Sequence, residues 1–123
     1  MPNVLTPADI AAALTERWSP RVIGEVDEAY VKVAKVQGSL AWHAHEAEDE
    51  LFLVLAGRLR IETEDGVLEL GPGQMTVIPR GLRHNPVADE ECLLMLIERK
   101  TTRHTGDIVS PLTRSIDEQL RPV

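Results

Sequence analysis

Short runs of β-forming residues alternate with turns through the middle of the chain, and this feature constrains the fold most. The runs lie at residues 22–26, 29–36, 40–45, 51–55, 58–62, 67–70, 75–78 and 92–98. Turns rich in Gly, Pro, Asp and Glu separate them, and no helical pattern lies between them. Many short strands without intervening helices are typical of an antiparallel sandwich or barrel. The sequence therefore predicts an all-β domain.

Two parts of this region carry more detailed expectations. The run 51–55 is apolar on both faces, which predicts a central strand covered on both sides. Asn85-Pro86 predicts a break in the chain, and Asp89-Glu90-Glu91 predicts a solvated turn before the last strand.

The N-terminal segment is helical in pattern. Thr6 and Pro7 form a helix start, with Thr at the N-cap and Pro at the first helical position. Apolar residues at helical spacing continue to Trp18, and Ser19-Pro20 ends the pattern. We expect a helix of about three turns that covers the outside of the sheet.

The chain divides into three parts by pattern. They are an N-terminal helical segment (1–20), a barrel (21–100) and a C-terminal tail (101–123). The tail is polar, and we expect it to lie extended on the barrel or on a second subunit. A short helical turn can form at 116–120.

Composition and charge limit the classes of partner. The chain has 123 residues, 43% of them hydrophobic, as expected of one globular domain. The net charge of −7 disfavours nucleic acid and anionic membranes as partners, although a bound cation would still attract a small anion. No apolar run approaches the ~18 residues of a transmembrane helix and no signal pattern opens the chain, so we expect a cytoplasmic protein.

The single cysteine, Cys92, excludes an internal disulfide and is interpreted as a buried small hydrophobic residue.

Potential metal ligands gather in two segments. His43 and His45 are two residues apart, so in a strand both side chains point to the same face. The polar residues 46–49 suit a turn, and a hairpin there would bring Glu50 back beside the histidines. A third histidine, His84, follows a Pro-x-Gly turn. Convergence of several such groups is the specific signal of a metal site.

The spacing of these residues follows two patterns, G-x4-H-x-H-x4-E-x6-G from Gly38 and G-x5-P-x-G-x2-H from Gly73. In this form the sequence resembles the cupin superfamily, over roughly residues 31–98. The resemblance implies an antiparallel β-barrel or jelly roll (a double-stranded β-helix) and a metal held by three His and one Glu. By that resemblance the ligands are His43, His45, Glu50 and His84. Two positions depart from the usual pattern, and neither is a ligand: the first glycine lies one residue closer to the histidines, and Ala88 replaces a common Asn.

Among cupins, the chain is most similar to short, single-domain microbial members, sometimes described as resembling mannose-6-phosphate isomerase. That description rests on the shared barrel. The sequence shows too little machinery for a full isomerase site, so we do not adopt it.

Other polar residues near the motifs receive simpler interpretations. Glu46, Glu48 and Asp49 cluster in the expected turn and are interpreted as a solvated loop rather than as ligands. Arg80 and Arg83 flank His84 and are candidates for holding an anionic ligand at the barrel mouth.

Two further side chains lie next to the motif or in the tail. Trp42 is expected to point away from its two histidine neighbours, into a core or an interface. His104 is expected to be exposed and unliganded beside a structural turn at Thr105-Gly106-Asp107, a run that some small cupins share.

The expected site predicts a metal-dependent function. Imidazole-rich sites suit Fe, Mn, Ni, Zn or Cu, so we expect one divalent ion per chain, of unassigned identity. Such an ion would act on a small oxygenated molecule at the barrel mouth, and hydrolysis, isomerisation, decarboxylation and dioxygenation fit equally well. Glu50 would be a ligand that also takes a proton if it detaches.

Two other function classes, a binding module and a DNA-binding regulator, differ from a metal-dependent enzyme in features that the sequence can be searched for. The alternative is a metal- or ligand-binding module without turnover, and a spare acid–base group in the pocket would distinguish the two; the sequence identifies none. A DNA-binding regulator is disfavoured because no helix-turn-helix segment is present and the charge is acidic. Because the run 51–55 needs cover on both faces, we expect a homodimer formed through the outer face of the sheet.

Overall fold

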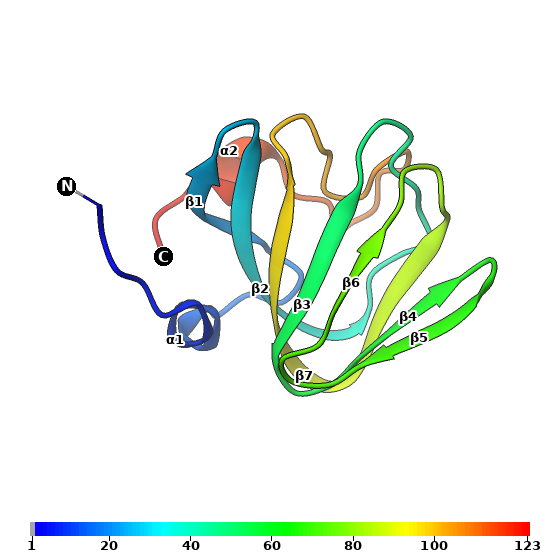
Figure 1. Cartoon of the computed structure of the whole chain (residues 1–123), viewed down its shortest axis with the longest axis horizontal. Helices are drawn as coiled ribbons and strands as arrows, with labels where there is room; N and C mark the ends of the chain where they lie inside the picture. The colour runs from blue at the N-terminus through cyan, green and yellow to red at the C-terminus, as the bar shows by residue number, and fades with distance from the viewer. Residues whose placement is uncertain (1) are drawn as a thin grey trace.

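A curved antiparallel sheet forms the body of the molecule in a computed structural model that describes residues 2–123 (Figure 1). The elements are α1 (Pro7–Ala13), β1 (Arg21–Val26), β2 (Ala29–Ser39), β3 (Glu50–Ala56), β4 (Leu59–Thr63), β5 (Gly66–Leu70), β6 (Met75–Ile78), β7 (His84–Arg99) and α2 (Ile116–Gln119). The strand order is β1-β2-β7-β3-β6, and β4 pairs with β7 and β5. The predicted all-β antiparallel fold with a short N-terminal helix is confirmed.

The longest strand, β7, contains two segments that the sequence predicts as interruptions. Asn85-Pro86 continues the strand and pairs with β4, so the predicted break is wrong. Further along, three residues of β7 (89–91) face a single residue of β2, Gln37. The surplus residues form a bulge, which places the three acidic side chains in solvent without a turn. The strand can therefore change partner from β4 to β3 while remaining extended.

The central strand is β3, between β6 and β7, as predicted. Its side chains alternate, so that Phe52 and Val54 are buried inside the barrel and their neighbours on the outer face are partly covered. The other strands contribute inward residues in the same way, and the largest of them fill the core with Val36, Leu59, Ile61, Ile78, Leu94 and Leu96.

The N-terminal helix is shorter than predicted. It ends at Ala13 because Leu14 has left the helical region, with ψ at 141°. Trp18 lies beyond the helix with a φ of 56°, and its ring is buried in the barrel core. Ala11 of the helix and Leu14 directly after it pack against Val33 on the outer face of β2, which confirms that the helix covers the outside of the sheet.

The predicted strand at 40–45 does not form. The chain leaves β2 at Ser39 and runs irregularly to Glu50, with one bridge to another segment. In that bridge the amide of His43 donates to the carbonyl of His84, and the amide of His84 donates back, both at 2.9 Å. The expected hairpin is thus replaced by a direct link between the two motif segments.

The C-terminal tail packs on the barrel of its own chain. Ser115 and Glu118 cap α2 reciprocally, as a capping box. The carbonyl of Pro122, close to the chain end, accepts a hydrogen bond from Arg21 at 3.1 Å. Within residues 2–123, no helix is long and apolar enough to cross a membrane.

Candidate metal centre

The four predicted ligands come together in the fold. His43 and His45 lie on the irregular segment after β2, Glu50 begins β3, and His84 begins β7. All four side chains are buried, and each offers a donor atom within 4.8 Å of the others. The bridge between the two motif segments places His43 beside His84, with ring centroids 4.4 Å apart. Backbone pairing therefore assembles residues that are far apart in sequence.

Backbone carbonyls orient two of the imidazoles in the same way. Nδ1 of His43 lies 2.8 Å from the carbonyl of Ala41, and Nδ1 of His84 lies 2.9 Å from that of Leu82. Since a carbonyl only accepts, each Nδ1 carries the proton and each Nε2 presents a lone pair. This is the arrangement that orients histidine for metal ligation.

The unpaired atoms of the cluster fit a cation. Nε2 of His45 and Nε2 of His84 each lie 3.5 Å from Oε1 of Glu50. Within the described chain, all three atoms are buried without a hydrogen-bond partner. Leaving one such atom unpaired costs about 1–3 kcal/mol, so three together need another partner. A divalent transition metal satisfies imidazole and carboxylate donors at once, and the cluster is able to bind one.

The pKa values of three of the four ligand side chains are shifted, and not all in the same direction. Burial lowers the pKa of His43 to about 4, so this imidazole is neutral at pH 7. Burial alone would raise the pKa of Glu50, but the close approach of Glu98, His45 and His84 outweighs it and lowers that pKa well below its usual range. Burial also opposes the charged form of His45, yet the carboxylate of Glu50, 3.5 Å from its Nε2, raises its pKa. The lowered pKa of Glu50 favours its carboxylate form, which is the form that binds a cation.

A buried polar chain lies behind Glu50, and the sequence reasoning missed it. Glu98 is the register partner of Glu50 on β7. Nζ of Lys32 donates to Oε1 of Glu98 at 2.7 Å and to Oε1 of Gln119 at 2.6 Å, although Lys32 is only 1% exposed. Burial and then the charge of Glu50 raise the pKa of Glu98 well above its ordinary value. The carboxyl of Glu98 is thereby suited to share a proton with Glu50.

The turn at Thr105-Gly106-Asp107 clamps the segment that carries two ligands. The amide of Ala44 donates to Oδ1 of Asp107 at 3.0 Å, and the amide of Asp107 donates to the carbonyl of Ala44 at 3.1 Å. Gly106 has a φ of 56°, and a side chain there would collide with the same carbonyl. The predicted structural turn is confirmed, and it fixes the backbone between His43 and His45.

The two predicted anion-binding arginines are already paired. Arg80 contacts Asp49 at 3.4 Å, and Arg83 contacts Asp107 at 2.9 Å. Hydrogen bonds with Arg80 lower the pKa of Asp49, and a backbone bond to Ala44 followed by Arg83 lowers the pKa of Asp107. Both arginines stabilise loops around the site, and their role toward an anionic ligand stays a prediction.

Expectations about two neighbouring side chains need correction. Trp42 is 44% exposed, because the segment that carries it is not a strand of the sheet, so a core role is wrong and an interface role stays a prediction. His104 is half-buried rather than exposed, because the tail folds back over the ligand segment. Its Nδ1 accepts a hydrogen bond from the amide of Arg114 at 2.9 Å.

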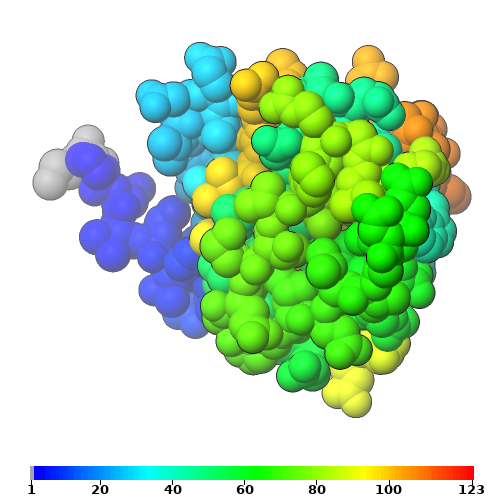
Figure 2. All heavy atoms as spheres, turned by 45° about the vertical axis from the view of Figure 1, so that its right-hand side comes forward, coloured from blue at the N-terminus to red at the C-terminus, as the bar shows by residue number. Residues whose placement is uncertain are grey.

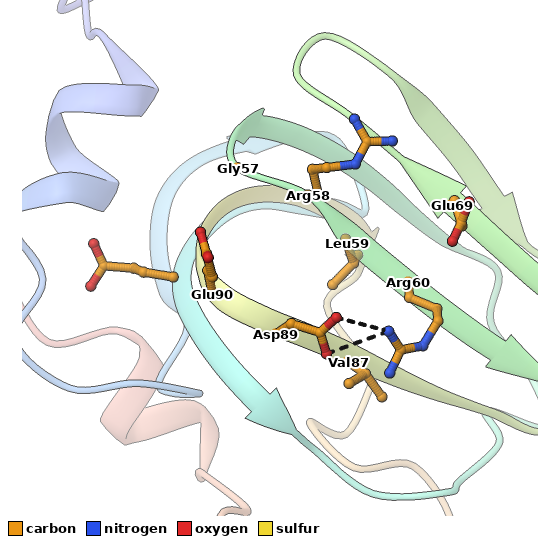
Figure 3. A pocket seen from close by; sticks show the side chains of 9 residues that line it. Gly57, Arg58, Leu59, Arg60, Glu69, Val87, Asp89 and Glu90 are labelled. Carbon is orange, nitrogen blue, oxygen red and sulfur yellow. Dashed lines mark hydrogen bonds and ion pairs between the residues drawn. The ribbon is translucent and has the colours of Figure 1, made fainter.

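Two hollows lie at opposite ends of β3. A cavity of about 30 Å³ beside the cluster is lined by His43, Glu50 and Glu98, together with apolar core residues and His104. A wider groove of about 370 Å³ follows the other end of β3, from Gly57 to Arg60, and is bordered by acidic residues of β7 (Figure 3). None of the four clustered ligands lines that groove.

The sequence matches one protein family, and similar sequences and solved structures are known. Residues 29–98 match the Cupin domain family. The uncharacterized protein YdbB of Bacillus subtilis (strain 168) is 32% identical over 101 residues, covering 81% of this chain and 87% of that protein. Homogentisate 1,2-dioxygenase of Pseudomonas entomophila (strain L48) is 38% identical over 73 residues, covering 55% of this chain but 17% of the enzyme. The crystal structure of a cupin-2 domain containing protein from Shewanella frigidimarina NCIMB 400 superposes with a TM-score of 0.76 at 41% identity, covering 79% of this chain and 95% of that one.

Proposed function

The chain belongs to the cupin family, and on that premise we propose that it is a metal-dependent enzyme that acts on a small oxygenated molecule. The observation that carries the proposal is the set of buried donors with no partner among residues 2–123: Nε2 of His45, Oε1 of Glu50 and Nε2 of His84. Buried polar atoms are nearly always paired, so an unpaired group of this kind indicates a missing ligand.

Each side chain of the cluster has a defined task in this proposal. His43, His45, His84 and Glu50 would hold the ion. A metal bound there would supply a Lewis acid and open positions for an oxygen ligand. Glu98 sits behind Glu50, where it can hold a proton, and Lys32 keeps Glu98 in place.

Among the reaction classes that fit, we place oxygen-dependent chemistry first for testing. The support is the sequence match to homogentisate 1,2-dioxygenase, which includes 55% of this chain. The cavity of about 30 Å³ favours a substrate smaller than an aromatic acid. Isomerisation, hydrolysis and decarboxylation are the outcomes to distinguish from it.

Metal analysis tests the proposal directly. The purified chain and its His43→Ala/His45→Ala/His84→Ala variant are loaded with Fe²⁺, Mn²⁺, Ni²⁺, Zn²⁺, Co²⁺ or Cu²⁺ and analysed for bound metal. We expect one equivalent in the wild type and none in the variant, followed by oxygen uptake with small hydroxy and keto acids. A folded wild-type chain that binds none of these ions would overturn the proposal.

A binding module without turnover is the second candidate. The specific observation in its favour is that Glu98, the acidic group that lines the cavity without being a predicted ligand, is already bonded to Lys32. Stoichiometric ligand binding by the metal-loaded chain, with no product formed from any tested acid, would favour this module.

We also propose that the chain is a homodimer through the outer face of the sheet. The register aligns apolar residues in two rows across β2, β7, β3 and β6, namely Val31–Ile97–Leu51–Val77 and Val33–Met95–Leu53–Met75. Val77 and Met75 are 48% and 54% exposed, and the segment that contains β5 and β6 forms the front of the molecule in Figure 2. The N-terminal arm extends away from the barrel, with Val4 fully exposed (Figures 1 and 2).

The oligomeric state is measured by sedimentation. We expect a dimer at micromolar concentration and a monomer after Val77→Glu, with the exposed change Val109→Glu in the tail as control. A monomeric wild type would contradict the dimer.

A further inference from the structure

The cavity beside the cluster is largely apolar. Trp18, Phe52, Leu94 and Leu96 form much of its wall. The indole Nε1 of Trp18 is bonded to the carbonyl of Gln37 at 2.8 Å, so its polar atom is already satisfied. A ligand in the cavity therefore meets apolar surface on most sides.

Four ionisable side chains also line the cavity, and three of them are engaged. His43 and Glu50 belong to the metal cluster. Glu98 is bonded to Lys32 at 2.7 Å and faces Glu50. His104, from the C-terminal tail, is the fourth, and it is outside the cluster.

The hydrogen bond of His104 determines which of its nitrogens carries the proton. The amide of Arg114 donates to Nδ1 of His104 at 2.9 Å, so Nδ1 must present its lone pair. The single proton of the neutral ring is therefore on Nε2. Among residues 2–123 no hydrogen bond is formed by that Nε2, although Nδ1 has its partner. Burial lowers the pKa of His104 to about 4, in agreement with a neutral ring.

We propose that His104 is a substrate-contacting residue, whose Nε2–H donates a hydrogen bond to an acceptor oxygen of the molecule bound at the metal cluster. This proposal rests on the proposed function, because it needs the metal to hold the other end of the molecule. It goes beyond the four ligands and gives the tail a part in recognition. His104 contributes a donor and not an acid, since loss of its Nε2 proton would leave an anionic ring.

The cavity limits the class of substrate. Its volume of about 30 Å³ leaves room for roughly two water-sized groups. One oxygen would bind the metal, a second would accept from His104, and a short apolar part would contact the wall. A small carboxylic acid or α-oxygenated acid has these features, and acetate is the simplest probe of the class.

The test uses the full chain loaded with Co²⁺, whose visible spectrum reports ligands that bind the metal. His104→Asn keeps an acceptor for the Arg114 amide, since its Oδ1 can replace Nδ1, but it lacks the distal donor. His104→Gln places an amide N–H near the position of Nε2. Each protein is titrated with acetate and, as matched probe, with methanethiolate, which binds metal through sulfur and offers no acceptor oxygen. Co²⁺ affinity and thermal melting are measured first.

We expect His104→Asn to weaken acetate about three- to tenfold, the effect of one hydrogen bond, with methanethiolate and Co²⁺ affinity changed less than about twofold. That selective loss supports the proposal, and recovery in His104→Gln would show further that the donor itself is responsible. Unchanged acetate affinity in His104→Asn, or equal loss of both probes, would overturn it. A wild-type chain that takes up no Co²⁺ would instead be a failure of the proposed metal function.

Discussion

The two ends of β3 hold polar side chains in opposite circumstances. At the Glu50 end, donor atoms of three residues are buried and have no protein partner among residues 2–123. At the Gly57 end, Arg60 is paired with Asp89 at 3.3 Å in an open groove (Figure 3). An exposed ion pair contributes little to the free energy of folding. A buried polar atom without a partner is costly, so such atoms indicate a bound ligand. The difference favours the Glu50 end as the metal site, whereas the charged side chains Arg60 and Asp89 in the wider groove are already paired.

The largest expected effect separates the two ends by metal affinity. His84→Ala removes one of the four donors, and we expect metal to bind about a hundredfold more weakly or not at all. Arg60→Ala, in the groove at the other end, should leave the affinity unchanged. Competition with a chromophoric chelator measures both variants. Equal affinities would mean that the buried donors do not hold the ion.

The next effect concerns stability and compares a buried ion pair with an exposed one. Lys32→Met leaves Glu98 without its cation in a buried position, and we expect a loss of about 3–5 kcal/mol in the free energy of unfolding. Lys100→Met removes the exposed pair with Glu25, at 2.8 Å, and should change stability little. Urea denaturation compares the two. Similar losses would contradict the distinction between buried and exposed pairs.

A third effect tests the clamp on the ligand segment. Gly106→Ala combines a positive φ with a collision at the carbonyl of Ala44, and we expect a loss of about 2–4 kcal/mol together with weaker metal binding. Gly73→Ala is the matched control, because it has a φ of 79° and no neighbour within 4 Å. Thermal melting and metal titration are the measurements. Equal losses of stability and of metal affinity in the two variants would mean that the backbone at Ala44 shifts to accept the new side chain, and that the clamp is not rigid.

The smallest effect is a pH dependence of the metal-free chain. Burial lowers the pKa values of His43 and His104 from 6.5 to about 4, so the unfolded chain takes up protons that the folded chain excludes. This stability is complete above pH 6.5 and is lost as the pH falls toward 4, while the raised pKa of His45 acts in the opposite sense. His104→Gln should lose about 1–3 kcal/mol less than the wild type over that range. Parallel pH profiles would show that His104 is not held neutral by burial.

The two motifs contain residues from both segments that meet at the metal cluster. Their resemblance to the cupin motifs gave the four members of the observed cluster. The local conformation was less predictable. His43 and His45 are aligned by a bridge to His84 and by the clamp at Ala44, and both depend on segments distant in the sequence.

The buried polar residues behind Glu50 and the position of the C-terminal tail also depend on segments distant in the sequence, so neither could be predicted. Lys32 and Glu98 are ordinary charged residues in sequence, and only the pairing of β2, β7 and β3 places them together behind Glu50. One signal was available, since Glu98 is in phase with the inward-facing Leu94 and Leu96. His104 had no such signal, because its position depends on how the tail folds back.

X-ray absorption at the metal edge of the Co²⁺-loaded chain is the most direct test of the central claim. We predict scattering from imidazole rings, with metal–nitrogen and metal–oxygen distances of about 2.0–2.2 Å, and loss of the imidazole signal in the triple histidine variant. A spectrum with oxygen scatterers alone, unchanged in that variant, would contradict the claim that His43, His45 and His84 converge on one ion.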